Sequence, residues 1–421
     1  MTDTQTTDPA AGASAAPDRH PDVPGLEAPA PPSQAVQHGL SAHTHGGAGV
    51  PSQSRGEHLA SFDVGDYPVP SGREEEWRFT PLDRLGGLMD GQPSDAHLAI
   101  DTDLPTNVQR VDVEPGDALL REVPAPIDRL GALALARSGG AVLVTVAPDA
   151  DVAAPVVVRL HGEGGPAPAW GHLIVDLGAF ARATVVLEHS GSARYDAGVS
   201  VLVGDGAELT LVSIQDWDDD AVHVGHVAFR VGRDAKVRST QVTLGGDLVR
   251  ITETVEYTGT GGDVELAGLY FADAGQHLEQ RLFIDHGVPN CRSNVVYKGA
   301  LQGDGAHTVW IGDVLIRHVA EGTDTYELNR NLILTDGARA DSVPNLEIET
   351  GEIVGAGHAS ATGRFDDEQL FYLMSRGIHP EEARKLVVRG FFNELLGKVP
   401  VDELRERLAA TIETRLDEVG A

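Results

Sequence analysis

The turns Gly178-Ala-Phe-Ala181, Gly204-Asp-Gly-Ala207 and Gly232-Arg-Asp-Ala235 decide the fold, because each precedes an alternating run of apolar and polar residues. Gly259-Thr-Gly-Gly262 continues the series, and the four turns recur at a nearly constant spacing of about 27 residues. Short β-branched runs such as Ala141-Val-Leu-Val-Thr-Val146 fill the chain from about residue 141 to 349. These runs predict strands, and no helical period interrupts them.

A repeat of about 27 residues that contains no helix fits one coil of a β-solenoid, in which each coil stacks on the next. The alternative is a β-sandwich, in which turns should recur every 8–12 residues or so without a longer period. We therefore expect a mainly β protein with a solenoid core. The two end coils of a solenoid have open strand edges, which invite either a cap or strand addition by a partner.

The composition excludes several classes of function. The chain has 64 Asp and Glu against 32 Lys and Arg, a net charge of −32, which argues against a nucleic-acid partner. Its single cysteine, Cys291, excludes an internal disulfide and cannot hold an iron–sulfur cluster alone. No phosphate-binding loop or nucleophile elbow occurs, so we do not expect the chain to hydrolyse nucleotides. Since no other hydrolytic constellation occurs either, we do not expect an enzyme. No run of about 18 apolar residues occurs, which predicts no membrane span and, with the lone cysteine, a cytoplasmic protein.

The composition and residue pattern divide the chain into four regions. Residues 1–60 are rich in Ala, Pro, Gly and His and predict a disordered tail, in which His43 and His45 could bind a stray metal ion. Residues 61–135 predict a helical or mixed region, residues 136–360 the β-helix core, and residues 361–421 a C-terminal helical domain.

Three helices are expected in the C-terminal domain. The first runs from Asp366 to Arg376 and ends at Gly377, a typical residue after a helix. The second starts at Pro380, with an apolar stripe that includes Leu386, Phe391 and Leu395. The third starts near Val401 and carries one apolar face, formed by Leu404, Leu408, Ile412 and Leu416.

Three groups of residues in the core suggest chemistry only weakly. His223 and His226 are spaced as ligands on a helix, but on a strand they point to opposite faces. The acidic run 216–220 could bind a hard cation, yet such a run between strands is usually a solvated turn. Cys291 precedes Arg292, which could lower its pKa, although a buried inert thiol fits equally well.

The C-terminal half of the chain carries a set of motifs in a specific order. They are Tyr297-Lys-Gly-Ala-Leu301, Asn329-Arg-Asn-Leu-Ile-Leu334, Pro344-Asn-Leu-Glu-Ile348, Gly357-His-Ala-Ser-Ala-Thr-Gly363 and Asp367-Glu-Gln-Leu-Phe-Tyr-Leu373, ending at Ser375-Arg-Gly-Ile378. Near the other end stands Pro70-Ser-Gly-Arg-Glu-Glu-Glu-Trp-Arg-Phe-Thr-Pro-Leu82. With these motifs the chain resembles the SufB/SufD family of iron–sulfur cluster assembly scaffolds, and is more similar to SufD.

The resemblance implies a right-handed parallel β-helix flanked by helical parts. It also implies a heterodimer with SufB, joined through the β-helices, in which a transient iron–sulfur cluster forms at the interface. A SufC ATPase subunit would dock on the C-terminal helices, where we expect contacts from Phe371, Tyr372, Arg376 and Gly377.

The family's proposed cluster ligand falls on His358, so the resemblance implies a metal role for this imidazole. The common SufD motif has a cysteine where this chain has Ala356, so SufB would have to supply the thiolates, with Glu347 or Glu349 as an assisting carboxylate. A purely structural role, in which His358 caps a coil and packs against the partner, stays open.

Two other functions are consistent with parts of the sequence. A β-helix carbohydrate lyase could use Asp216 or Asp218 with a basic partner. A homodimer that stores iron or flavin is the third hypothesis, because reduced flavin is associated with complexes of this family, although the sequence has no flavin fingerprint.

Overall fold

The structure is a computed structural model that describes residues 57–365 and 367–418, all within one compact unit, Gln53–Ala421. Most of the segment expected to be disordered, including His43 and His45, lies outside the described residues.

The N-terminal region mixes short helices and strands, as expected. Its elements are η1 (Val64–Asp66), α1 (Leu82–Leu85), α2 (Gly87–Asp90), β1 (Ala99–Asp103), β2 (Val108–Val113), η2 (Ala118–Arg121) and α3 (Arg129–Arg137). Helix α3 begins after Asp128, whose carboxylate accepts a hydrogen bond from the Gly131 amide at 2.8 Å.

Strands joined by turns make up the fully described stretch 141–364, and no helix lies between them. They are β3 (Ala141–Val146), β4 (Val156–Leu177), β5 (Arg182–Val203), β6 (Glu208–Trp217), β7 (Val222–Val231), β8 (Lys236–Thr243), β9 (Leu248–Tyr257), β10 (Asp263–Ala272), β11 (His277–His286), β12 (Arg292–Leu301), β13 (His307–Ile316), β14 (Asp324–Ile333), β15 (Arg339–Ile348) and β16 (Gly355–Arg364).

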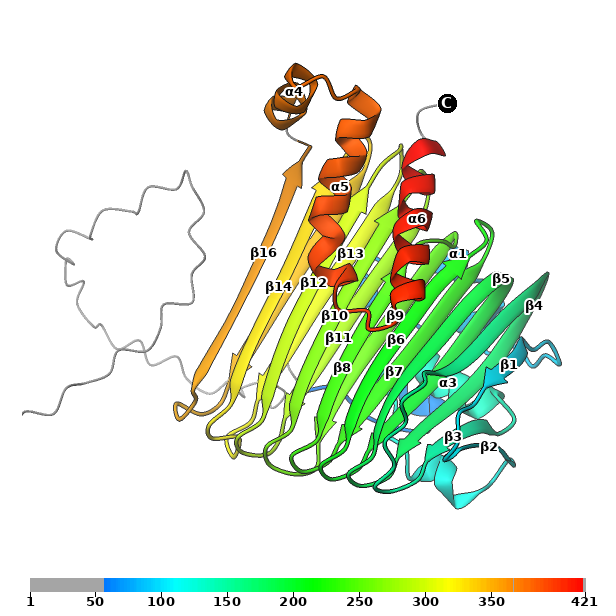
Figure 1. Ribbon diagram of the computed structural model, residues 1–421. Coiled ribbons are helices and arrows are strands. Elements are labelled where there is room, and N and C mark those ends of the chain that lie inside the picture. Colours follow the sequence, from blue (N-terminus) through cyan, green and yellow to red (C-terminus); the bar gives the residue numbers. More distant parts are fainter. Residues whose placement is uncertain (1–56, 366, 419–421) are drawn as a thin grey trace, which may run out of the picture. The chain divides into compact units, whose positions relative to one another are not determined.

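The strands wind into a parallel β-solenoid, which confirms the predicted fold class (Figure 1). From β6 onward, even-numbered strands pair with even-numbered ones and odd with odd, so each coil contributes one strand to each of two sheets. The long strands β4 and β5 continue from one sheet into the other.

The register gives the length of each coil. Arg182, Glu208, Lys236 and Asp263 are successive partners, so an early coil takes about 27 residues. The next partners are Arg292, Asp324 and Gly355, so the last coils grow to about 31 residues. The predicted period is therefore correct for the early coils, and the last coils are longer.

Helices cover part of each outer face of the solenoid. The outward side chains of the even sheet, such as Val212, Leu269 and Phe271, pack against the C-terminal helices. The odd sheet packs Val222 and Val224 against the N-terminal helices. In the middle coils, such as β9 and β11, nearly every strand residue is therefore buried, and polar residues are buried together with apolar ones.

The three C-terminal helices are α4 (Asp367–Ser375), α5 (Pro380–Leu396) and α6 (Asp402–Glu418), and α5 and α6 lie along the even sheet (Figure 1). The predicted face of α6 is confirmed, because Leu404, Leu408, Ile412 and Leu416 are all buried. The predicted stripe of α5 is partly wrong: Leu386 is 43% exposed, and Val388 and Phe392 are buried with Leu395.

The two ends of the solenoid differ. At the N-terminal end, β1 runs antiparallel to β4 and β2 runs antiparallel to β3, so both sheets are capped. At the other end, within the described ranges, β15 pairs only with β13 and β16 only with β14. The C-terminal end therefore presents two open strand edges.

Candidate functional site

His358 lies on the open edge strand β16, and its side chain is exposed. In the parallel register it is paired with Glu327 on β14, and neighbouring parallel residues project to the same side of a sheet. The alternate residue Leu328 packs against the C-terminal helices, whereas Glu327 is 1% exposed. The His358 side chain therefore projects toward the solenoid interior at its open end.

Glu327 is an unusual residue for a solenoid interior. Neither of its carboxylate oxygens has a hydrogen-bond partner among the described residues. Burial, with the charge of Asp313, raises the pKa of Glu327 to about 8. The carboxyl reaches across to the opposite sheet, where a Cβ on Gly312 would lie 2.7 Å from Glu327 Oε1.

The neighbouring interior is polar as well. Tyr270 Oη donates to Asn331 Oδ1 at 2.7 Å, and Asn329 Nδ2 donates to Tyr270 Oη at 2.9 Å. Tyr297 Oη donates to Glu253 Oε2, and burial raises the pKa of Glu253 to about 7. The coils from β9 to β14 therefore hold hydrogen-bonded polar side chains behind the open end, and neither Glu327 oxygen is bonded to them.

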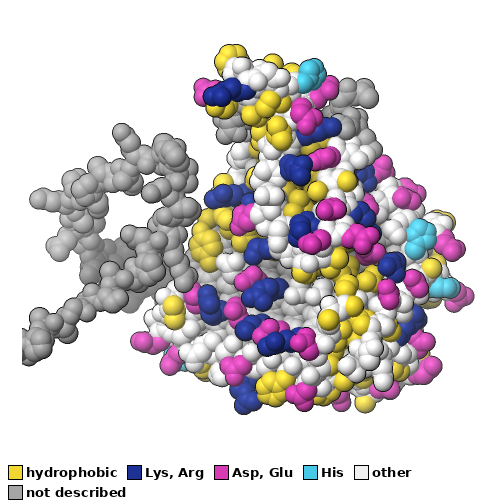
Figure 2. All heavy atoms as spheres, viewed as in Figure 1, with side chains coloured by type: hydrophobic (Ala, Val, Ile, Leu, Met, Phe, Trp, Pro, Cys, Tyr) yellow, Lys and Arg dark blue, Asp and Glu magenta, His cyan; other side chains and the backbone are white. Residues whose placement is uncertain are grey.

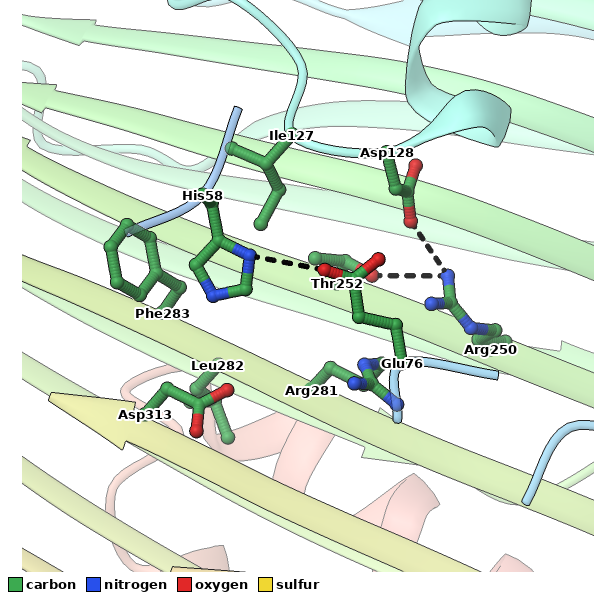
Figure 3. A pocket seen from close by; sticks show the side chains of 10 residues that line it. All are labelled: His58, Glu76, Ile127, Asp128, Arg250, Thr252, Arg281, Leu282, Phe283 and Asp313. Carbon is green, nitrogen blue, oxygen red and sulfur yellow. Dashed lines mark hydrogen bonds and ion pairs between the residues drawn. The ribbon is translucent and has the colours of Figure 1, made fainter. Parts of the chain in front are cut away.

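A cleft of about 430 Å³ opens on the outer surface beside β13 and the edge strand β15. Its lining includes the carboxylates Glu75, Glu76, Asp313 and Glu347, with Arg281 and His58. Figure 3 shows a neighbouring pocket that shares His58, Glu76, Arg281 and Asp313 with this cleft. In it His58 Nδ1 lies 3.5 Å from Glu76 Oε1. Burial raises the pKa of Asp313, which accepts a hydrogen bond from Asn345 at 2.6 Å. The cleft is mainly acidic and adjoins an open strand edge.

A buried ion network fixes the N-terminal region to the odd sheet behind this cleft. Arg250 Nη1 donates to Asp128 Oδ2 at 3.0 Å, and its Nε lies 3.3 Å from Glu279 Oε1 (Figure 3 shows Arg250 and Asp128). The Arg250 guanidinium also lies 4.2 Å from the centre of the Trp77 ring. Burial opposes ionisation of Glu279, but His277, Arg250 and Arg281 outweigh it and hold its pKa below the usual range.

The predicted contacts for an ATPase subunit lie on an exposed surface formed by α4 and the two residues after it. Phe371 and Tyr372 are 73% and 57% exposed. Arg376 lies over the Tyr372 ring at 5.0 Å and donates to its hydroxyl at 2.9 Å, and Gly377 has a left-handed φ of 85° that ends the helix. Figure 2 shows hydrophobic side chains on this segment next to basic ones. Exposed aromatic side chains in such a setting are typical of protein contacts.

The weaker candidates are placed as structural residues. His223 faces the interior beside Gln215, and His226 bonds Thr254 on the outer face, so they cannot share a metal. Asp218, Asp219 and Asp220 lie in an exposed turn, and Asp219 pairs with Arg415. This arrangement does not favour the lyase hypothesis.

Cys291 is buried in the solenoid interior, and its thiol lies 3.5 Å from the Gly259 carbonyl oxygen. Burial raises the pKa of the Cys291 thiol, so the inert interpretation is favoured. No cluster of three or more His, Cys, Asp or Glu side chains that could hold a metal occurs among residues 57–365 and 367–418. A metal at His358 would therefore need ligands from another chain.

Two features were missed in the sequence. Glu327 stands in the polar stretch Asp324-Thr-Tyr-Glu-Leu328, which gives no sign that a carboxylate is buried. Arg250 and Glu279 are register partners on neighbouring coils. Their separation in the sequence, roughly one coil length, could have indicated that the two side chains lie close together. No helix in the described part of the chain is long and apolar enough to cross a membrane.

Comparisons with known proteins agree with the fold and the motifs. A family model described as "SUF system FeS cluster assembly, SufBD core domain" matches residues 159–391. Iron–sulfur cluster assembly SufBD family proteins of Mycobacterium bovis and Mycobacterium tuberculosis are 55% identical over 386 residues, which cover 90% of this chain and 96% of each relative.

More distant relatives carry a more specific name. The iron–sulfur cluster assembly protein SufD of Escherichia coli is 28% identical over 247 residues, 58% of each chain. The protein of the same name in Bacillus subtilis is 26% identical over 296 residues, 68% of this chain and 67% of the relative.

Proposed function

Because this chain belongs to the SufBD family of iron–sulfur cluster assembly proteins, we propose that it is a scaffold subunit that pairs with SufB and binds the SufC ATPase. The observation that carries the proposal is the open C-terminal end of the solenoid. There the edge strands β15 and β16 have no further strand partner in the described ranges, and β16 carries the exposed His358. Strands of a SufB chain would add to β15 and β16 and close this end.

The nascent iron–sulfur cluster is the cargo of this interface. The imidazole of His358 is the ligand that this chain would offer, and the thiolates would come from SufB, because Cys291 is buried away from the open end and position 356 is alanine. The chain would hold and orient the site, and ATP hydrolysis would take place on SufC.

The acidic cleft supports the choice of β15 as a contact strand. Glu75, Glu76, Asp313 and Glu347 line its wall and floor, so a basic side chain on an added strand would find complementary charge there. The exposed ring pair Phe371 and Tyr372, with Arg376, would form the SufC contact. The cytoplasmic location, flavin binding and a competing homodimer stay predictions.

Co-purification tests the proposed assembly. We expect the full chain to co-elute with SufB and SufC in size-exclusion chromatography. An Arg376→Glu variant should bind SufC at least about tenfold more weakly, because reversal of the charge removes the cation from the Tyr372 ring and adds a negative charge to the contact. SufB binding should not change in this variant.

Arg389→Glu is the matched control, since Arg389 is an exposed α5 residue paired with Glu413. This variant should bind SufC as the parent does. Absence of a stable complex under native conditions would contradict the assembly, and unchanged SufC affinity of Arg376→Glu would contradict docking on α4.

A further inference from the structure

The last two coils place one carboxyl directly behind His358. On β14 the inward side chains are Thr325, Glu327, Asn329 and Asn331, all of them buried. His358 is the register partner of Glu327, and adjacent strands of a sheet lie about 4.8 Å apart. Both side chains project to the same side, so a Glu carboxyl and an imidazole of neighbouring coils can meet one metal ion.

The burial of Glu327 has a cost that nothing in the described structure offsets. Asn329 and Asn331 beside it are hydrogen-bonded to each other at 2.8 Å, but both Glu327 oxygens lack a partner within the described residues. An unsatisfied buried polar group costs on the order of 1–3 kcal/mol. Glu327 lies one coil inside the open end. Its carboxyl is therefore a candidate to form a bond only when another group occupies that end.

The other carboxylates near this end have different surroundings. Glu347 alternates with the inward residue Leu346 and lines the outer cleft. Glu349 Oε2 accepts a hydrogen bond from the His318 amide at 3.0 Å. Of these three carboxylates, Glu327 is the one that shares a register position and a face with His358.

We propose that Glu327 and His358 together form a two-ligand site for a divalent metal ion of the iron(II) class at the open end of the solenoid. An imidazole nitrogen and a carboxylate oxygen suit such an ion, and two protein ligands leave coordination positions free for ligands of a partner chain. The inference rests on the proposed function, and it assigns to Glu327 the ligand role that the sequence suggested for Glu347 or Glu349.

Titration of the full chain with Co²⁺, as an air-stable probe for iron(II), tests this site by calorimetry. All proteins in the titration, including the parent, carry His43→Asn and His45→Asn. These changes remove the histidine pair that the sequence suggests as a competing metal site. Mutation of a residue that only orients a metal-bound histidine lowers metal affinity about 10–100-fold, so loss of a metal ligand itself should lower the affinity at least as much. We therefore expect Glu327→Gln and His358→Ala each to bind Co²⁺ at least about tenfold more weakly than the parent.

Glu347→Gln and Glu349→Gln are the matched controls and should bind within about twofold of the parent. Glu327→Gln preserves shape and should fold, as a thermal melt monitored by circular dichroism will show, and Glu327→Met serves in its place if it does not. Parent-like Co²⁺ affinity in the folded Glu327 variant would overturn the two-ligand site. Since co-elution with SufB and SufC is measured separately, that result would leave the proposed assembly standing.

Discussion

An Arg250→Ala variant is expected to lose about 3–5 kcal/mol of unfolding free energy, because it leaves two buried carboxylates without their shared cation. The Arg250 side chain is 3% exposed, and its partners Asp128 and Glu279 are 9% and 0% exposed. Substitution also removes the cation from the Trp77 ring. Urea unfolding followed by circular dichroism measures the loss.

Arg230→Ala is the control, since Arg230 also pairs with a carboxylate, Glu256, but the two side chains are 34% and 44% exposed. Such a pair is worth about 0–1 kcal/mol, so this variant should unfold close to the parent. If Arg250→Ala were no more damaging than Arg230→Ala, the network would not be what fixes the N-terminal region to the odd sheet.

A His358→Ala variant is expected to fold and assemble normally but to lose most of the cluster in a reconstituted complex with SufB and SufC. His358 is exposed on an edge strand, so its removal should cost little stability. The cluster would lose an imidazole ligand that the thiolates of SufB do not replace. Iron and sulfide content per complex, with the visible absorption of the cluster, measures the effect.

Ser360→Ala provides the matched control, because Ser360 is an exposed residue on the same strand and the same face. It should leave the cluster yield unchanged. Full cluster content in His358→Ala would instead support the structural role, in which the histidine only caps the coil and packs against SufB.

The solenoid could be predicted because the early turns are tight and regular. The spacing of about 27 residues between the glycine turns reappears as the register of β5, β6, β8 and β10. The later coils have longer turns, and their length of about 31 residues hides the period. The sequence did not show which end of the solenoid would be open. Both end coils have unpaired strand edges, and only the antiparallel pairing of β1 and β2 caps the N-terminal end.

The site was harder to predict, for a physical reason that β14 shows well. In a strand with one wet face, alternation would place Leu328 inside and Glu327 in water. Here the helix α5 and its neighbours cover the outer face, so Leu328 packs outward and Glu327 faces the interior. Because the apolar residue faces outward and the acidic one inward, the alternation in the sequence gives the wrong side for the Glu327 carboxyl. His358 could be predicted because a family motif surrounds it.

Hydrogen–deuterium exchange of the chain, free and bound to SufB, tests the central claim most directly. The account predicts that exchange slows at least about tenfold in peptides that cover β15 and β16, residues 339–348 and 355–364, while β1 and β2 exchange as before. Unchanged exchange in β15 and β16 within a stable complex, or protection at the capped end instead, would contradict it.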